Sequence, residues 1–168
     1  MIEIVRGDIV AQTTDAIVNS ANSSLLPGSG LSGAIHLAAG RHMELECIQI
    51  GACPAGEARI TAGYLLPAKY VIHAVAPQYW DGTRGEADTL RNTYRAIFEL
   101  AEANGIKSVS IPAIGTGIYR FPIEAATQIA IEEAFARVEQ IHVRFVCFNE
   151  DQQKIYETAF QRVRDKKA

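Results

Sequence analysis

Residues 16–40 read AIVNSANSSLLPGSGLSGAIHLAAG, and this stretch contains the unit that decides the fold class. The apolar residues 16–18 predict a short strand, and the polar, small residues 19–30 predict a loop. Residues 31–39 predict a helix that ends at Gly40. A strand, a loop at its carboxyl end and a helix therefore follow one another, which is the repeating order of an α/β protein.

The same alternation continues along the chain. Apolar positions from Leu90 to Ala101 have the spacing of a helix over 86–103, and Gly105 ends it. Strands separated by helices predict a largely parallel sheet covered on both faces, a three-layer α/β fold. A length of 168 residues is the size of one domain, and we expect a single domain over 1–168. The other predicted strands are 2–6, 57–61, 70–75, 109–113 and 143–148, and the other predicted helices run from Pro122 to about 138 and over 151–163.

The composition is that of an ordinary globular protein, with 48% hydrophobic and 21% charged residues. No apolar run approaches the roughly 20 residues of a membrane span, and the N-terminus lacks a signal-peptide pattern. We therefore expect a cytoplasmic protein with no membrane partner. The 16 basic and 19 acidic residues, a net charge of −3, argue against an extended nucleic-acid surface. No seam or apolar stripe indicates an oligomer, and we expect a monomer.

The cysteines and histidines predict neither disulfides nor a metal site. Cys47, Cys53 and Cys147 are an odd number of cysteines in a chain without an export signal. The spacing of His36, His42, Cys47 and Cys53 matches no compact zinc motif. We therefore expect no disulfide, no metal ion and no cofactor.

Two glycine-rich segments follow predicted strands, where α/β sheets bind their ligands. Residues 28–33, GSGLSG, match G-x-G-x-x-G, but a nine-residue stretch separates them from the strand and no acidic residue follows about twenty positions later. This disfavours a Rossmann motif, and the absence of Gly-Lys-Ser/Thr excludes a P-loop. Together with residues 115–117, GTG, this loop can hold a diphosphate through backbone amides and helix dipoles. The alternative is that the glycines only make tight turns.

Four side chains near the same sheet edge have both a structural and a functional interpretation. Asp8 is a turn or cap residue, or a carboxylate that accepts a hydrogen bond from a base amine. Asn19 and Asn22 satisfy loop backbone groups, or they bind ligand through ribose hydroxyls. Phe148 belongs to the core, or it stacks on a base.

Several segments resemble the macrodomain family in order and spacing, and most closely its MacroD-like branch. The segments are Gly7-Asp8-Ile9, residues 15–22, Gly33-Ala34-Ile35-His36, residues 70–73 and residues 112–122. The resemblance runs from residue 2 to about residue 160. It implies a mixed, mostly parallel sheet of about six strands between helices. It also implies a cleft whose partner is ADP-ribose or ADP-ribosylated protein.

The resemblance assigns roles to residues by position. It implies that Asp8 takes the adenine amine beside the amide of Ile9, that Phe148 flanks the adenine, and that Asn22 contacts the distal ribose. The residues implied to form the diphosphate loops and the distal-ribose pocket are Gly28, Ser29, Gly30, Leu31, Ser32, Gly115, Thr116, Gly117, Ile118, Tyr119 and Phe121.

One position departs from the MacroD-like pattern Gly-Gly-Gly-Gly-Val-Asp-Gly, in which the Asp helps to activate a water. The corresponding residues 27–33 read PGSGLSG, so Ser32 stands at the Asp position. A serine hydroxyl can orient a water but cannot act as a base near neutral pH.

Three functions are to be considered. The first is a hydrolase of ADP-ribosylated protein or O-acetyl-ADP-ribose in which Asn22 and Ser32 position the reactants. The second is an ADP-ribose reader without useful catalysis. The third is a sensor of free nucleotides or of nucleic-acid ends.

Overall fold

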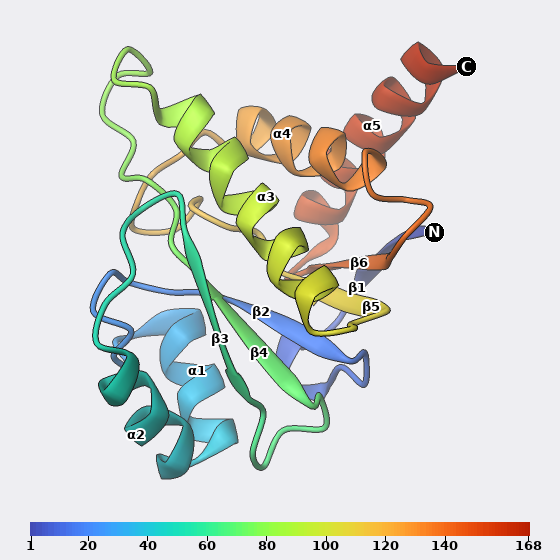
Figure 1. Ribbon diagram of the computed structural model, residues 1–168. Helices are drawn as coiled ribbons and strands as arrows, with labels where there is room; N and C mark the ends of the chain where they lie inside the picture. The colour runs from blue at the N-terminus through green and yellow to red at the C-terminus, as the bar shows by residue number, and fades with distance from the viewer.

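Figure 1 shows the computed structural model, which describes residues 1–168 as one sheet between two layers of helices. The three-layer α/β architecture expected from the sequence is confirmed. The strands are β1 (Ile2–Arg6), β2 (Ala16–Ser20), β3 (Ala58–Ala62), β4 (Tyr70–Ala74), β5 (Ser108–Ile111) and β6 (His142–Cys147). The helices are the short 3-10 helix η1 (Ile9–Ala11), α1 (Gly30–Ala39), α2 (Arg41–Ile50), α3 (Glu86–Ala103), α4 (Ile123–Phe135) and α5 (Glu150–Lys167).

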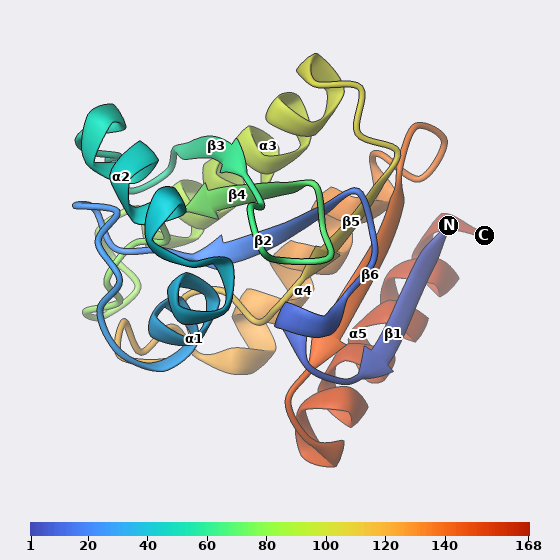
Figure 2. The same cartoon turned by 90° about the horizontal axis from the view of Figure 1, so that it is seen from below.

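The sheet has the strand order β1-β6-β5-β2-β4-β3. All neighbouring strands are parallel except β3, which is antiparallel to β4. Figure 2 shows β2 and β4 pointing in one direction and β3 in the other. This is the mixed, mostly parallel sheet of six strands that the resemblance implies, and it brings the carboxyl ends of the five parallel strands to one edge.

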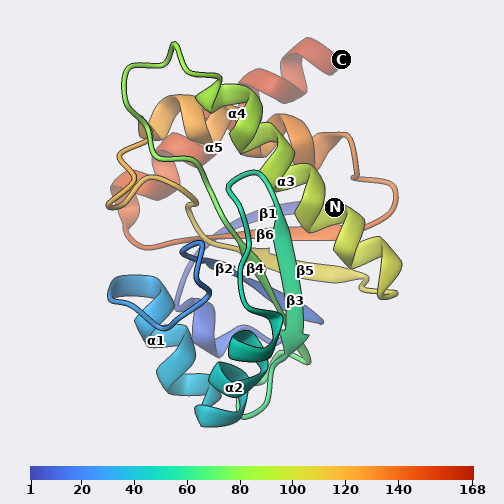
Figure 3. The same ribbon diagram turned by 60° about the vertical axis from the view of Figure 1, so that its left-hand side comes forward.

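The sheet separates two cores of unequal size. Helices α3, α4 and α5 cover one face over a cluster of 28 buried residues, and α1 and α2 cover the other over a cluster of 14. Figure 3 shows these helix layers on opposite sides of the sheet. The central strands β2 and β4 are buried along nearly their whole length, as expected for strands covered on both faces. None of the helices is both long and apolar enough to cross a bilayer.

Helix α2 is absent from the sequence prediction. It begins directly after Gly40, whose φ of +91° favours glycine and turns the chain out of α1. Of its residues only Met43 and Cys47 are buried. One buried residue per turn is too narrow a stripe to show a helical period among polar neighbours.

Three strands end earlier than the sequence predicts, and β4 does so by one residue, at Ala74 rather than at residue 75. Strand β5 ends at Ile111 rather than at residue 113, and β6 ends at Cys147 rather than at residue 148. Asn149 caps α5, because its side-chain oxygen accepts a hydrogen bond from the N–H of Gln152 (2.9 Å). The chain therefore leaves the sheet at Phe148, which is 87% exposed, and the alternative that Phe148 belongs to the core is wrong.

One buried carboxylate holds the loop between β4 and α3. Glu86 Oε2 accepts hydrogen bonds from the N–H groups of Trp80, Asp81 and Gly82 at 2.9–3.2 Å, and Oε1 accepts one from the N–H of Arg84 at 2.6 Å. Burial by itself would raise the pKa of Glu86, but these backbone donors, Gly82 first, lower the pKa to about 2. The ionised carboxylate thus fixes the loop against the start of α3.

We expect Glu86→Gln to destabilise the protein at neutral pH, because an amide cannot accept hydrogen bonds through both of its polar atoms. Since the native pKa lies below the value of about 4.3 for an unfolded Glu, the contribution is complete above that pH and is lost as the pH falls toward about 2. Urea denaturation at a series of pH values should therefore show a smaller acid-dependent loss of unfolding free energy in the variant. Glu99→Gln, at an exposed position of the same helix, should follow the wild type. Identical pH dependence of wild type and Glu86→Gln would contradict this role.

Candidate functional site

A cavity of about 340 Å³ opens at the sheet edge where β2 and β5 end. Its walls are the segments 20–32 and 113–119. The lining residues are Ser20, Ala21, Asn22, Gly28, Ser29, Gly30, Leu31, Ser32, Ala113, Gly115, Gly117, Ile118 and Tyr119. A hollow of about 420 Å³ at the opposite edge, beside residues 105–107 and 136–141, contains neither glycine loop. The cavity at the carboxyl edge is therefore the candidate site.

The first wall is a loop that leads into α1. The side-chain oxygen of Asn22 accepts hydrogen bonds from Ser24 Oγ (2.7 Å) and from the N–H of Leu26 (3.2 Å), and its Nδ2 donates to the carbonyl of Leu26 (2.9 Å). Gly28 lies against this amide, because a Cβ there would be 3.3 Å from Asn22 Nδ2, and its φ of +64° favours glycine. The N–H groups of residues 30–32, in the first turn of α1, have no hydrogen-bond partner within the protein.

The second wall is the turn after β5. The carbonyl of Gly115 accepts a hydrogen bond from the N–H of Phe121 (2.9 Å), which closes the turn. The N–H of Tyr79 donates to the carbonyl of Tyr119 (2.8 Å) and joins the turn to the loop after β4. The N–H groups of residues 115–119 have no partner within the protein. Both walls of the cavity therefore offer free backbone donors.

No lysine, arginine or histidine lines the cavity. Its positive potential comes from backbone N–H groups and from the amino end of α1, whose dipole favours an anion. Concave sets of backbone N–H groups bind phosphate groups in this way. The structure thus brings together the two glycine loops of the sequence analysis around a space that suits a phosphate ligand.

Ser32 lies in the first turn of α1 and is 7% exposed. Its hydroxyl oxygen accepts a hydrogen bond from Asn19 Nδ2 (3.3 Å). Asn19 lies in β2, is fully buried and does not line the cavity. The structure therefore separates the two asparagines: Asn22 lines the cavity, whereas Asn19 supports Ser32 from within the core.

A buried hydrogen-bond chain continues from Asn19 into the sheet. Asn19 Nδ2 lies 3.2 Å from His73 Nδ1, and His73 Nε2 lies 3.0 Å from Thr61 Oγ1. Burial lowers the pKa of His73 to about 3, with a smaller contribution from His36, so the ring is neutral at neutral pH. Because the Thr61 hydroxyl donates to the carbonyl of Ala62 (3.0 Å), His73 Nε2 donates to Thr61 and Nδ1 accepts from Asn19.

Several predicted binding residues do not line the cavity, namely Asp8, Ile9, Asn19, Thr116, Phe121 and Phe148. Asp8 caps η1, because its Oδ1 accepts a hydrogen bond from the N–H of Val10 (3.1 Å). The ring of Phe121 packs edge-on against Tyr79, with centroids 4.9 Å apart. Asp8 and Phe148 follow the neighbouring strands β1 and β6, so they lie farther along the same sheet edge as the cavity.

Three lining residues, Ser20, Ala21 and Ala113, were not predicted from the sequence. Each stands at or just after the end of β2 or β5. Only their position at the carboxyl ends of these strands could have predicted them, since their small side chains do not indicate a binding role. The chain from Asn19 to His73 and Thr61 was also missed, because no spacing in the sequence connects these residues.

Comparisons with known proteins agree with this geometry. The macro domain family model matches residues 18–130. A macro domain-containing protein of Mesorhizobium japonicum is 46% identical over 159 residues, covering 92% of this chain and 90% of that protein. A protein of Escherichia fergusonii named O-acetyl-ADP-ribose deacetylase is 43% identical over 165 residues, covering 92% of each. The solved structure of an Oceanobacillus iheyensis macrodomain mutant with ADPR (ADP-ribose) has a TM-score of 0.92 at 36% identity, covering 98% of this chain and 94% of that one. The chain therefore belongs to the macro domain family.

Proposed function

We propose that this macro domain binds ADP-ribose in the cavity between residues 20–32 and 113–119 and hydrolyses an ADP-ribose linkage. The observation that carries the proposal is the presence of free backbone N–H groups on both walls, at 30–32 and 115–119. The relative named O-acetyl-ADP-ribose deacetylase and the macrodomain solved with ADPR support this ligand class. We also propose a monomer, since all the groups it uses belong to one chain, and a cytoplasmic location.

In the proposed complex the diphosphate lies between the two walls. Each free N–H can donate to a phosphate oxygen, and hydrogen bonds to an ionised acceptor are stronger than neutral ones. Fixed N–H dipoles act over a shorter range than a lysine or arginine charge. The site should therefore favour a ligand that fills the cavity over a bare phosphate ion.

The two ends of the ligand extend from the diphosphate in opposite directions. We assign the distal ribose to Asn22 and Tyr119, because both line the cavity and Asn22 Nδ2 keeps a second hydrogen besides the one given to Leu26. We assign the adenine to the strand ends beyond β5, where Asp8 Oδ2 takes no hydrogen bond from the protein and the ring of Phe148 is exposed. Stacking on adenine would bury that ring.

For hydrolysis, Ser32 holds a water rather than removing its proton. Asn19 Nδ2 donates to the Ser32 oxygen, which leaves the hydroxyl proton free for a water or a substrate oxygen. Asn22 and a phosphate oxygen of the substrate complete the placement of the water. Fixed geometry of this kind can lower a barrier by roughly 7–11 kcal/mol in favourable cases.

Calorimetric titration tests the proposed ligand, with ADP and NAD as controls. We expect ADP-ribose to bind most tightly, and Gly117→Val to weaken binding by at least about 100-fold, or about 2.7 kcal/mol. A Cβ at Gly117 meets no protein atom within 4 Å, so the variant should fold and its side chain should occupy ligand space. Gly117→Ala should show a smaller loss. Retained affinity in folded Gly117→Val would overturn the assignment of this loop.

Asn22→Ala should reduce turnover by about 100-fold, the cost of a misplaced reacting group, while changing the Kd for ADP-ribose less than tenfold. Because Asn22 also holds its own loop, Ser24→Ala is the matched control: it removes the 2.7 Å bond to Asn22 Oδ1 without touching the cavity lining. Steady-state kinetics on O-acetyl-ADP-ribose should show near wild-type turnover for Ser24→Ala. Equal losses in the two variants would mean that Asn22 acts only by shaping the loop.

Ser32 favours a second candidate function, a reader that binds ADP-ribose without useful turnover. The residue offers no base, and its side chain is almost fully buried within the first wall. In that case the cavity would recognise ADP-ribose on a protein and leave the linkage intact.

Ser32→Asp separates the two functions. If the cavity is a working hydrolase site that lacks only a base, the carboxylate should raise turnover by roughly 10²–10⁴-fold with little change in affinity. Ser32→Asn has the same size without basicity and should give no gain. Turnover that stays at the background rate in wild type and Ser32→Asp alike, with ADP-ribose binding intact, would favour the reader.

A further inference from the structure

Three potential metal ligands meet in the smaller core, away from the cavity lining. They are His36 on α1, Cys47 on α2 and His73 on β4, and all three are buried. One ligand atom of each lies within 4.8 Å of the other two, and Cys47 Sγ is 3.8 Å from His73 Nε2. Three segments of the chain therefore bring two imidazoles and a thiol close together.

The hydrogen bonding of this cluster is incomplete. His36 is 6% exposed, and neither of its ring nitrogens has a hydrogen-bond partner. Buried polar atoms nearly always have partners, so a buried imidazole without one calls for a partner such as a water or a metal ion.

We propose that His36, Cys47 and His73 form a buried site for a soft metal ion, and that the site suits Cu(I) best. Thiolate and imidazole are ligands that Cu(I) and Zn²⁺ share. In a trigonal site with bonds of about 2.0–2.3 Å, ligand atoms lie roughly 3.5–4 Å apart, which matches the distance between Cys47 and His73. The ligand atoms of all three residues lie within 4.8 Å of one another, so His36 must move closer where its distance exceeds this spacing.

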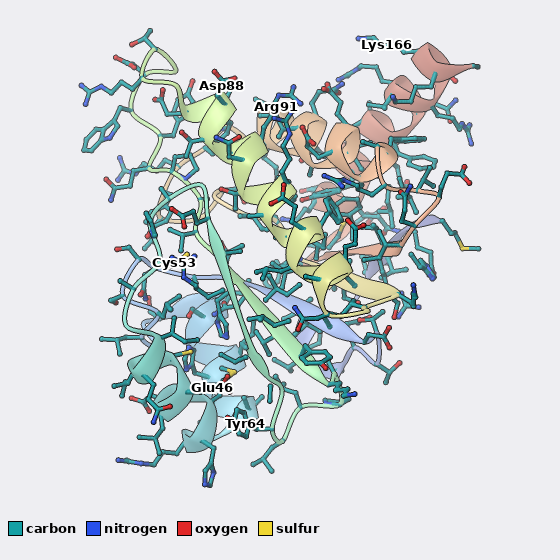
Figure 4. All side chains as sticks on the ribbon, in the orientation of Figure 1. Glu46, Cys53, Tyr64, Asp88, Arg91 and Lys166 are labelled. Atoms are coloured by element: carbon teal, nitrogen blue, oxygen red, sulfur yellow. The ribbon has the colours of Figure 1, made fainter.

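Charge favours the monovalent ion. A single thiolate with Cu(I) is neutral, whereas Zn²⁺ would keep a net positive charge that no other ligand of the three-residue cluster balances. No carboxylate belongs to the cluster. The nearby Glu46 instead accepts a hydrogen bond from the hydroxyl of Tyr64 (2.6 Å). Figure 4 shows this pair beside α2.

The proton balance of binding is simple. The thiol of Cys47 releases one proton as the metal–sulfur bond forms. His73 keeps one ring proton, which moves from Nε2 to Nδ1 so that the Nε2 lone pair can bind the ion. Asn19 Oδ1, which is buried and has no partner, can then accept from Nδ1 after the amide turns over, and this rearrangement ends the hydrogen bond from Asn19 Nδ2 to Ser32. A metal-bound histidine usually donates its other ring N–H to such an oxygen.

The test is anaerobic titration of the reduced, metal-free protein with Cu(I), in competition with a Cu(I)-specific chelator. We expect one equivalent to bind, with the thiolate-to-copper absorption in the ultraviolet. Cys47→Ser should weaken binding by at least 100-fold. Cys53→Ser and Cys147→Ser are the matched controls, since both thiols are also free and buried but lie outside the cluster, and both variants should bind as the wild type does.

If Cys47→Ser folds poorly, His36→Leu provides a second test of the metal site. It removes a ligand and two unpartnered polar atoms at once, so the metal-free variant should be at least as stable as the wild type while losing the metal. A parallel titration with Zn²⁺ should show weaker binding. Tighter Zn²⁺ binding that needs Cys47 would keep the site and overturn the choice of ion. Absence of one-to-one binding, or unchanged binding in Cys47→Ser, would overturn the site.

Discussion

Strand β2 lies between β5 and β4 and pairs with both in parallel, and this pairing positions the whole candidate site. Ala16 and Ile17 stand opposite Val109 and Ser110, so both strands deliver their next residues to the same sheet edge. The chain after β2 becomes one wall of the cavity, and the chain after β5 becomes the other. An antiparallel pairing would send the two glycine loops to opposite edges. The donors at 30–32 and 115–119 converge only because the two strands are parallel neighbours.

The glycines then decide what the converging loops can offer. Gly28 and Gly115 take positive φ values, which let the backbone turn while leaving the N–H groups beyond each turn unpaired. At Gly115 there is also little room, since a Cβ would be 3.0 Å from the Cβ of Ala76. The resulting cavity offers its donors through the backbone, and a protein of net charge −3 can in this way present a site that suits a diphosphate.

The sequence predicts best what depends on local pattern. The periodicity of Leu90, Tyr94 and Ile97 predicted α3 over its actual span, and the alternation of strands and helices predicted the parallel sheet. Both glycine loops were identified because their composition is unusual and their position follows strands. Helix α2 was missed because its stripe of Met43 and Cys47 is too narrow. Contacts between distant segments, such as that of Asn19 with His73, cannot be predicted from a single sequence. Each of the two residues taken alone is compatible with several roles.

The pair of asparagines illustrates this limit in physical terms. Asn19 and Asn22 are three residues apart, and the first lies in a strand while the second lies in the loop after it. In a strand successive side chains alternate between faces, so Asn19 points into a core and can be kept there only by polar partners. It finds them in Ser32 and His73, on a helix and a neighbouring strand that the sequence places far away. The buried amide thereby fixes the hydroxyl of Ser32, so the chemistry open to this position depends on the core behind it as well as on the residue itself.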